Sequence, residues 1–281
     1  MELSTLAVTG STGKLGGILA QILADRGIGQ RLLVRTPSRA PQLPGATVHS
    51  CDYGDYEEAM AGLSGVKTLF MVSASESSER VAQHRSFVDA AAAAGVERVI
   101  YTSFVGASPE ATFTLARDHF ATEEHIRRSP MAWTFLRDNF YIDFMASLAG
   151  EDGVIRGPAG QGRAAVVARA DIALAAAAVL GDPAPHAGRI YDLTGREALS
   201  LADVARIVGA ARGTEVRYHD EAVAEAYESR ASYGAPAWQV DAWVSTYTAI
   251  ASGELEKVSG DVERLTGTAP RTLAEFLSAG E

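Results

Sequence analysis

The chain has 281 residues, enough to bury a substantial core as one large α/β unit or as a large domain with a smaller lobe. Its formal net charge of −10 argues against a nucleic-acid partner, because binding a phosphate backbone requires clustered cations. A single cysteine, Cys51, excludes an internal disulfide and a cysteine-rich zinc site. No apolar stretch is long enough to span a membrane, and the first ten residues lack signal-peptide features. We therefore expect a soluble, cytoplasmic protein.

The first half of the chain alternates short apolar runs with amphipathic stretches, as in βαβ units on a parallel sheet. Six buried strands are predicted, at residues 4–9, 31–34, 47–51, 68–72, 98–102 and 133–137. Helices are predicted between them, at residues 13–26, 55–63, 79–94 and 117–129. Because crossovers between parallel strands are right-handed, helices should cover both faces of the sheet, which is the doubly wound, Rossmann-type α/β class.

The regular alternation ends after residue 137. The glycine-rich segment 150–162 is typical of a loop or hairpin, a helix capped by Asp171 is predicted through residue 180, and residues 190–193 form a candidate strand. Ser200 is expected to cap a helix through about residue 212, and residues 214–269 are mostly helical in pattern. We expect a larger domain at residues 1–150 and a small, mostly helical lobe at residues 151–281 that partly shares the sheet.

A glycine-rich turn follows the first predicted strand. Gly10, Gly13 and Gly16 stand at G-x-x-G-x-x-G spacing between that strand and the next helix. Gly10 permits the tight turn, Gly13 lets the backbone approach a pyrophosphate, and Gly16 lets the helix pack against the strand. The helix N-terminus then presents unpaired N–H groups and a positive dipole end to phosphates. Glycine spacing alone is a weak signal, but in a run of βαβ units it predicts a dinucleotide site.

The residues after the second strand indicate which dinucleotide is bound. An NAD site typically carries a carboxylate about 20 residues beyond the turn, where it bonds the ribose 2′-hydroxyl. This chain instead has Arg35 there, followed by Ser38 and Arg39. A guanidinium suits a 2′-phosphate, so the sequence predicts NADPH, with NADH as the second choice. The alternative interpretation of Arg35 is a solvated arginine at the end of a strand.

Segments over nearly the whole chain carry a resemblance to a known family. The sequence resembles the NmrA-like branch of the atypical short-chain dehydrogenases/reductases, and within it the NAD(P)H:quinone oxidoreductases. The matching segments are TGSTGKLGG (9–17), LVRTPSR (33–39), CDYGD (51–55), RVAQHRSFVDAAAAAGVERVIYTS (80–103), HFATEEHIRRS (119–129), FLRDNFY (135–141), ARADIALAAAAVL (168–180), YDLTGREALSLADVA (191–205) and DVERLTGTAPRTLAEF (261–276).

The resemblance implies an NADPH-dependent oxidoreductase with a small C-terminal substrate lobe. It places the cofactor over the C-terminal edge of the sheet, against Gly10, Ser11, Thr12, Gly13, Lys14, Leu15, Gly16 and Arg35. Asp52, at the end of the third strand, would meet the exocyclic amine of adenine. The nicotinamide side would be lined by residues at the ends of the fourth and fifth strands, namely Ser73, Ala74, Ser75, Thr102, Ser103 and Phe104.

The Tyr-x-x-x-Lys pair of most short-chain reductases is absent. In that pair the lysine lowers the pKa of the tyrosine, which protonates the carbonyl oxygen as hydride arrives. The only lysines are Lys14, Lys67 and Lys257, and none has a tyrosine four residues before it. A quinone needs this acid least, because hydride addition gives an aromatic hydroquinone anion, a far weaker base than an alkoxide. The sequence therefore favours a quinone-like acceptor and disfavours an epimerase or a reductase of unactivated ketones.

Three side chains are candidates for the substrate end. By resemblance to extended relatives, Glu123 puts His119 at the lysine position and Leu115 at the tyrosine position. His119 either donates a proton or bonds a cofactor ribose, or it is a structural hydrogen-bond partner. Asn139 and Tyr141 follow the sixth strand, where substrate is expected. The Asn139 amide suits a quinone oxygen, and Tyr141 is either a substrate contact or a packing residue.

The small C-terminal lobe, with its potential aromatic pocket, favours an enzyme, although one alternative stays open. No metal site is predicted, because His119 and His125 lie on poorly matched faces of a helix without cysteines nearby. Trp238, Trp243 and Tyr247 are interpreted as core, with an aromatic pocket in the C-terminal lobe as the alternative. The main rival to a quinone-reducing enzyme is an NADP(H)-binding redox sensor of the NmrA type, which would signal through a partner without catalysis. A homodimer is a further possibility.

Overall fold

The computed structural model describes residues 4–280, and these form two units. One unit contains the chain up to Ser103 together with Asp118–Arg137 and Ile172–Tyr191. The other contains Phe104–Arg117, Asp138–Asp171 and the residues from Asp192 onward. The units are interleaved along the chain, whereas the sequence predicts a single boundary after residue 150. The chain leaves the first unit after Ser103 and again after Arg137, and both residues lie next to the end of a strand of the sheet. These two positions therefore lack the composition that is typical of a linker.

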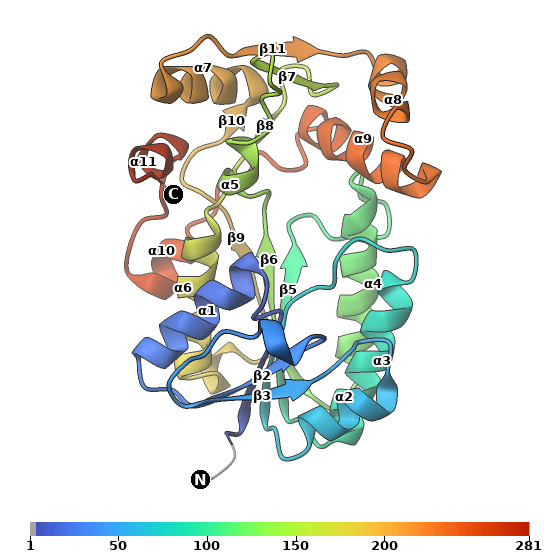
Figure 1. Ribbon diagram of the computed structural model, residues 1–281, viewed down its shortest axis with the longest axis vertical. Coiled ribbons are helices and arrows are strands. Elements are labelled where there is room, and N and C mark those ends of the chain that lie inside the picture. The colour runs from blue at the N-terminus through green and yellow to red at the C-terminus, as the bar shows by residue number, and fades with distance from the viewer. Residues whose placement is uncertain (1–3, 281) are drawn as a thin grey trace. The chain divides into compact units, whose positions relative to one another are not determined.

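The first unit is built on a seven-stranded sheet with the order β3-β2-β1-β4-β5-β6-β9 (Figure 1). The strands are β1 (Leu6–Thr9), β2 (Gln30–Val34), β3 (Ala46–Ser50), β4 (Thr68–Met71), β5 (Arg98–Phe104), β6 (Ala132–Asp138) and β9 (Arg189–Leu193). The pairs β1–β2, β2–β3, β1–β4 and β4–β5 are parallel. The strand order reverses at β1, which makes the edge beyond β1 and β4 the topological switch point of the sheet.

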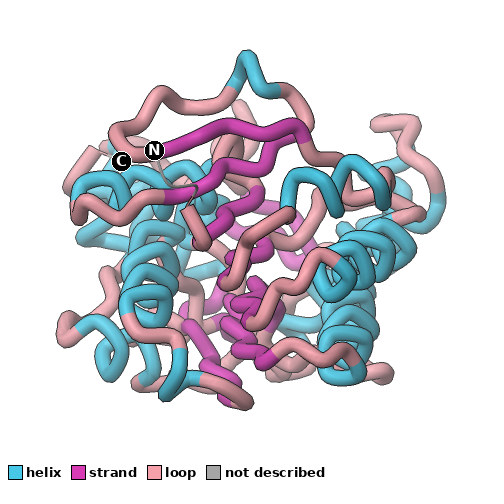
Figure 2. The backbone as a smooth tube through the Cα atoms, turned by 90° about the horizontal axis from the view of Figure 1, so that it is seen from below, coloured by secondary structure: helices cyan, strands magenta, loops and turns pink. Residues whose placement is uncertain are grey.

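Helices cover both faces of this sheet (Figures 1 and 2). One face carries α1 (Lys14–Asp25) and α6 (Arg169–Gly181), and the other carries α2 (Tyr56–Leu63), α3 (Arg80–Ala93) and α4 (Thr114–Arg128). Short 3₁₀ turns lie at Pro37–Arg39 and Ala184–His186. Buried apolar side chains such as Leu69, Phe87 and Phe135 fill the space between sheet and helices. The predicted Rossmann-type α/β fold is confirmed, with α4 beginning three residues earlier than expected.

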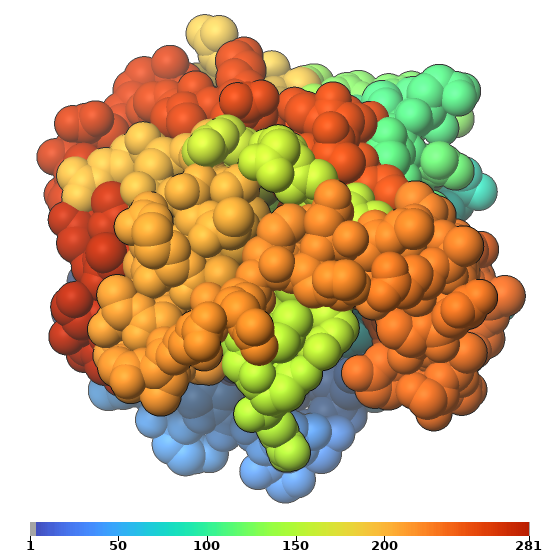
Figure 3. Space-filling view, turned by 90° about the horizontal axis from the view of Figure 1, so that it is seen from above, coloured from blue at the N-terminus to red at the C-terminus, as the bar shows by residue number. Residues whose placement is uncertain are grey.

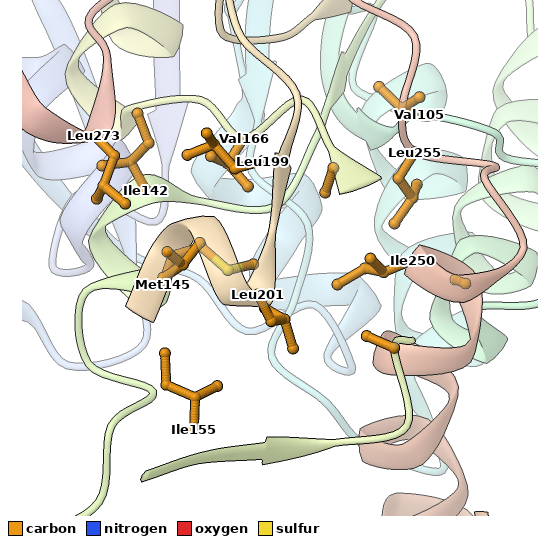
Figure 4. Packing of buried hydrophobic residues seen from close by; sticks show 14 of the residues in the cluster. Val105, Ile142, Met145, Ile155, Val166, Leu199, Leu201, Ile250, Leu255 and Leu273 are labelled. Atoms are coloured by element: carbon orange, nitrogen blue, oxygen red, sulfur yellow. The ribbon is translucent and has the colours of Figure 1, made fainter. Parts of the chain in front are cut away.

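The regular secondary structure of the second unit is mostly helical, and it surrounds an apolar core of its own. The helices are α5 (Ile142–Met145), α7 (Leu201–Arg212), α8 (Val223–Ala231), α9 (Ala237–Ala251), α10 (Asp261–Thr266) and α11 (Leu273–Ser278). Side chains from several of these segments meet in one cluster, which includes Met145, Leu201, Ile250 and Leu273 (Figure 4). Burial of such side chains, at about 25 cal/mol per Å² of apolar surface, is the main source of stability of this unit.

The structure corrects two strand predictions after residue 137. Segment 150–162 is not a hairpin: β7 (Val154–Gly157) pairs in parallel with β11 (Arg217–Asp220), and β8 (Arg163–Ala164) pairs antiparallel with β10 (Leu199–Ser200). Strand β11 lies within the stretch 214–269, which the sequence predicts as mostly helical. Its four residues, RYHD, have no apolar alternation, so only the pairing with β7 makes them a strand.

The two predicted helix caps have different outcomes. Ser200 caps α7 as expected, because its side chain accepts the N–H of Asp203 in a capping box. Asp171 is not an N-cap, because α6 begins two residues before it. The Asp171 carboxylate instead accepts the backbone N–H of Arg271 at 2.8 Å. Within residues 4–280, no helix combines the length and apolarity needed to cross a membrane.

Candidate functional site

A cavity of about 460 Å³ lies in the first unit at the C-terminal ends of β1, β2, β3 and β4. This is the topological switch point, where ligands of open α/β sheets bind. The cavity is lined by the turns that follow these four strands. Its lining residues include Thr9, Gly10, Thr12, Gly13, Val34, Arg35, Arg39, Cys51, Asp52, Tyr53, Val72, Ser73, Ala74, Ser75 and Gln83. Sequence-predicted residues from four separate segments therefore share one cavity.

The glycine turn has the backbone geometry that its spacing predicts. Gly10 has a φ of +66°, in the left-handed region that side chains disfavour. A Cβ at Gly16 would lie 2.4 Å from the carbonyl oxygen of Gly10, so only glycine permits this contact between α1 and β1. Gly13 occupies the N-cap position of α1 and supplies no side-chain cap. The first N–H groups of α1 are therefore available to an anion.

The remaining predicted residues of the turn have different environments. Thr12 and Lys14 are exposed, whereas Leu15 is buried in the packing of α1. The hydroxyl of Ser11 is buried and has no hydrogen-bond partner among the described residues. A buried hydroxyl without a partner costs free energy, which an oxygen-rich ligand at the turn would recover. The uncapped helix N-terminus thus fits a bound pyrophosphate, whereas Ser11 does not line the cavity and its contact with the cofactor stays a prediction.

Two arginines line the cavity on the side of β2. Arg35 follows β2 directly, and Arg39 ends the adjoining 3₁₀ turn. Both are exposed, and within the described residues neither forms an ion pair or a side-chain hydrogen bond. Asp52, on the β3 side, accepts the N–H of Gly54 at 2.8 Å. Two unpaired guanidinium groups beside one cavity favour a phosphate more than a free hydroxyl.

The predicted residues at the end of β5 do not line this cavity. Thr102 and Ser103 are buried: the hydroxyl of Thr102 accepts the N–H of Ser73 at 2.8 Å, and that of Ser103 donates to Glu123 at 2.6 Å. Glu123 is fully buried and also pairs with Arg137 at 2.7 Å. Phe104 belongs to the second unit, where its ring packs against Phe113. Cofactor contacts of these three residues stay predictions.

His119 is a buried residue of α4 with both ring nitrogens engaged. Its Nε2 lies 3.0 Å from a guanidinium nitrogen of Arg80, and its Nδ1 lies 3.0 Å from the Tyr101 hydroxyl. A guanidinium can only donate, so Nε2 accepts and Nδ1 carries the proton. Burial, and then the charge of Arg80, lower the pKa of His119 well below its ordinary value. These contacts favour the structural interpretation, and a catalytic His119 stays a prediction.

Asn139 and Tyr141 lie in the second unit. The Asn139 amide is buried, donating to the carbonyl of Leu255 at 2.9 Å and accepting the N–H of Phe140 at 2.7 Å. The ring of Tyr141 faces the guanidinium of Arg169 at 4.2 Å, and its hydroxyl lies 3.4 Å from Asp138. Both amide atoms of Asn139 therefore hold backbone groups in place. A substrate contact by either residue stays a prediction.

A second cavity, of about 530 Å³, lies within the second unit between β7 and the helices α8 and α9. Figure 3 shows this surface, with the yellow-green residues around β7 beside the orange residues of α8 and α9. Four aromatic side chains are among its lining residues: Phe144, Tyr233, Trp243 and Tyr247. The sequence interpretation of Trp243 and Tyr247 as core is therefore incomplete, because both also line a cavity. Within residues 4–280, no cluster of three or more metal-ligating side chains is present.

Comparison with known families identifies the chain. Residues 2–277 match the model of the NmrA-like family. This protein belongs to that family. The family resemblance predicted from the turn, the strand ends and the C-terminal segments is thereby confirmed.

Individual relatives cover the chain from end to end. It is 35% identical to quinone oxidoreductase 2 of Escherichia coli (strain K12), over 97% of both chains. It is 30% identical to the NAD(P)H azoreductase of Xenophilus azovorans, over 98% of this chain and 97% of that protein. Among solved structures, an NADPH-dependent quinone oxidoreductase of Escherichia coli complexed with NADPH superposes with a TM-score of 0.89 at 34% identity. That superposition covers 98% of this chain and 99% of the other.

Proposed function

We propose that this NmrA-like protein is an NADPH-dependent oxidoreductase that reduces quinone-like acceptors. The observation that carries the proposal is the cavity of the first unit, which joins an uncapped helix N-terminus to two unpaired guanidinium groups. A pyrophosphate and a 2′-phosphate are the ligand groups that match these two features. The names of the relatives, a quinone oxidoreductase and an azoreductase, support the reaction class.

Different residues of the cavity would bind different parts of the cofactor. The backbone of the turn from Gly10 to Gly13 would hold the pyrophosphate. Arg35 and Arg39, which line the cavity, would hold the 2′-phosphate, and Asp52 would accept from the adenine amine. NADPH, when bound, supplies the hydride. NADH lacks the group that the two arginines recognise, so we expect it to bind more weakly.

The choice of acceptor follows from the missing Tyr-x-x-x-Lys pair. An acceptor whose reduced anion is a weak base can take its proton from water, whereas an alkoxide needs a positioned acid. We do not assign this acid to His119, because its Nε2 accepts from Arg80 and its Nδ1, which carries the proton, faces the buried hydroxyl of Tyr101. Quinones are therefore the proposed acceptors, and unactivated ketones are not.

Catalytic oxidation of NADPH under anaerobic conditions tests this proposal. With a simple benzoquinone, the nicotinamide absorbance should fall and hydroquinone should accumulate in equal amount, whereas an aliphatic ketone should cause no change. If NADPH binds but no quinone oxidises it, the protein is a redox sensor instead of an enzyme.

The proposal also covers the cellular location and the oligomeric state of the protein. We propose a cytoplasmic protein, because a lone buried cysteine needs no oxidising compartment. The acidic net charge makes a nucleic-acid partner unfavourable. A homodimer is also proposed, and sedimentation equilibrium tests it directly, since a mass of one chain at all concentrations contradicts it.

A further inference from the structure

The segment that follows β4 forms one wall of the cofactor cavity, and side chains hold its backbone. The N–H of Val72 donates to the hydroxyl of Thr9 at 2.8 Å, and the carbonyl of Val72 accepts from the Tyr53 hydroxyl at 2.7 Å. The N–H of Ser73 donates to Thr102 at 2.8 Å. Backbone groups beyond the end of a strand usually bond water or other backbone groups. Here side chains from three other segments of the first unit replace those partners.

Ala74 is held at both of its backbone polar groups by α3. Its N–H donates to Nε2 of His84 at 2.8 Å, and its carbonyl accepts from Nε of Arg80 at 2.9 Å. The residues His84 and Arg80 are 0% and 4% exposed, so water cannot easily replace either bond. Because Ala74 lines the cavity, this pair of bonds fixes the position of a cavity wall.

The hydrogen-bond directions require His84 to be neutral. Since Nε2 accepts from Ala74, the ring proton is on Nδ1, which donates to the hydroxyl of Thr122 at 2.8 Å. That hydroxyl in turn donates to the carbonyl of Asp118. Burial, and then the charge of Arg80, lower the pKa of His84 to about 3. The acceptor for Ala74 is therefore present throughout the neutral pH range.

Arg80 is held in turn by two residues of α4. One guanidinium nitrogen donates to Nε2 of His119 at 3.0 Å, and another lies 3.5 Å from the carboxylate of Asp118. These contacts fix the guanidinium plane while Nε remains directed at Ala74. His119 thus affects the cavity wall through Arg80.

We propose that His84, Arg80 and His119 are positioning residues that preorganise the segment 73–75 for cofactor binding. The inference rests on the proposed function, because it concerns the same cavity. In this account His119, at the position where extended relatives carry lysine, contributes to cofactor affinity and takes no part in proton transfer. Loss of the support should weaken binding of NADPH and NADH alike, since residues 73–75 belong to a different segment from the arginines that recognise the 2′-phosphate.

Two substitutions of His84 separate the hydrogen bond from general packing. In His84→Gln the amide oxygen can still accept the N–H of Ala74, whereas in His84→Leu that N–H has no acceptor. We expect the Kd for NADPH to rise about tenfold in the leucine variant, the cost of one unsatisfied buried donor, and to return to within about threefold in the glutamine variant. Fluorescence titration of NADPH measures both. A leucine variant that is folded by circular dichroism and binds like the wild type overturns the proposal.

Hydrogen exchange in the wild-type protein gives a readout that does not depend on any variant. The amide of Ala74 should be protected from exchange without cofactor, because the bond to His84 exists before binding. Rapid exchange of this amide in the free protein means that no preorganised wall exists, and contradicts the proposal even if the leucine variant fails to fold.

Kinetics of His119→Leu separate positioning from catalysis. Positioning raises the KM for NADPH and leaves kcat at saturating NADPH within about twofold, whereas a lost proton donor lowers kcat. His125→Ala, a partly exposed histidine on the same helix, is the matched control and should change neither value. If the wild type itself fails to bind NADPH, the proposed function is wrong. If it binds NADPH and the His84 variants bind equally well, only the positioning inference is wrong.

Discussion

Arg35 and Arg39 are the residues on which the choice of cofactor depends. Replacing Arg35 with alanine removes a charge-assisted hydrogen bond to the 2′-phosphate, so NADPH binding should weaken by about 1.5–3 kcal/mol. NADH has no 2′-phosphate, so its affinity should be nearly unchanged. Calorimetric titration of both cofactors measures the difference, with the exposed Arg128 replaced by alanine as control. An equal loss of affinity for NADPH and NADH would falsify the assignment of Arg35.

At this residue scale, sequence and structure contributed different parts of the site. Gly10 and Arg35 could be predicted as lining residues of the cavity, because each stands at a fixed distance from a strand. A glycine suits a tight turn, and an arginine suits a phosphate. The roles of His84 and Tyr53 could not be predicted, since each bonds the backbone of another segment and the family segments that contain them indicate no such contact. The position of His119 relative to Glu123 makes it a candidate, but its contact with Arg80 becomes apparent only in the structure.

The contact between β1 and α1 is the element on which the shape of the cavity depends. A Cβ at Gly16 would lie 2.4 Å from one backbone atom of Gly10 and 2.5 Å from another, so Gly16→Ala must displace α1 from β1. We expect a loss of about 1–3 kcal/mol in the free energy of unfolding, as for overpacked sites, together with weaker NADPH binding. Urea unfolding and NADPH titration measure the two effects.

Gly181→Ala is the matched control for that substitution. Gly181 ends α6, and a Cβ there meets nothing within 4 Å, so the variant should be neutral or slightly more stable than the wild type. If Gly16→Ala is as stable as Gly181→Ala and binds NADPH equally well, the close packing of α1 is not what shapes the site.

Helices and strands could be predicted from the sequence where a pattern of apolar residues within the segment itself determines them. The strands and helices of the first half follow apolar runs and amphipathic periods, and Ser200 caps α7 as its position indicates. Strand β11 was missed because its residues are polar and its partner β7 is remote in sequence. The interleaving of the two units was missed for the same reason: contacts between distant segments leave no mark in composition.

At the scale of the whole molecule, the buried neutral histidines make stability dependent on pH. The pKa of His84 is about 3 in the folded chain and 6.5 in the unfolded chain. Between these two pH values the unfolded chain therefore binds more protons than the folded chain. Its contribution is complete above pH 6.5 and falls as the pH decreases. Between pH 7 and pH 5 the free energy of unfolding should fall by about 2 kcal/mol on account of this residue.

The variant His84→Gln isolates this contribution, because glutamine does not titrate. Urea unfolding at pH 7 and pH 5 should show a loss about 2 kcal/mol smaller in the variant than in the wild type. The raised pKa of buried Asp138 acts in the opposite direction, and it cancels because both proteins contain it. Equal losses in the two proteins would mean that His84 is protonated in the folded state, contrary to the hydrogen bond from Ala74.

The most direct measurement of the central claim is a single turnover under anaerobic conditions. Protein saturated with NADPH, deuterated at both C4 positions or at neither, is mixed with a benzoquinone in a stopped-flow instrument. We predict that the nicotinamide absorbance falls as hydroquinone forms, and that deuterium slows this step by a primary isotope effect. Bound NADPH whose absorbance persists in the presence of quinone would contradict the account and identify a protein that binds the dinucleotide without using its hydride.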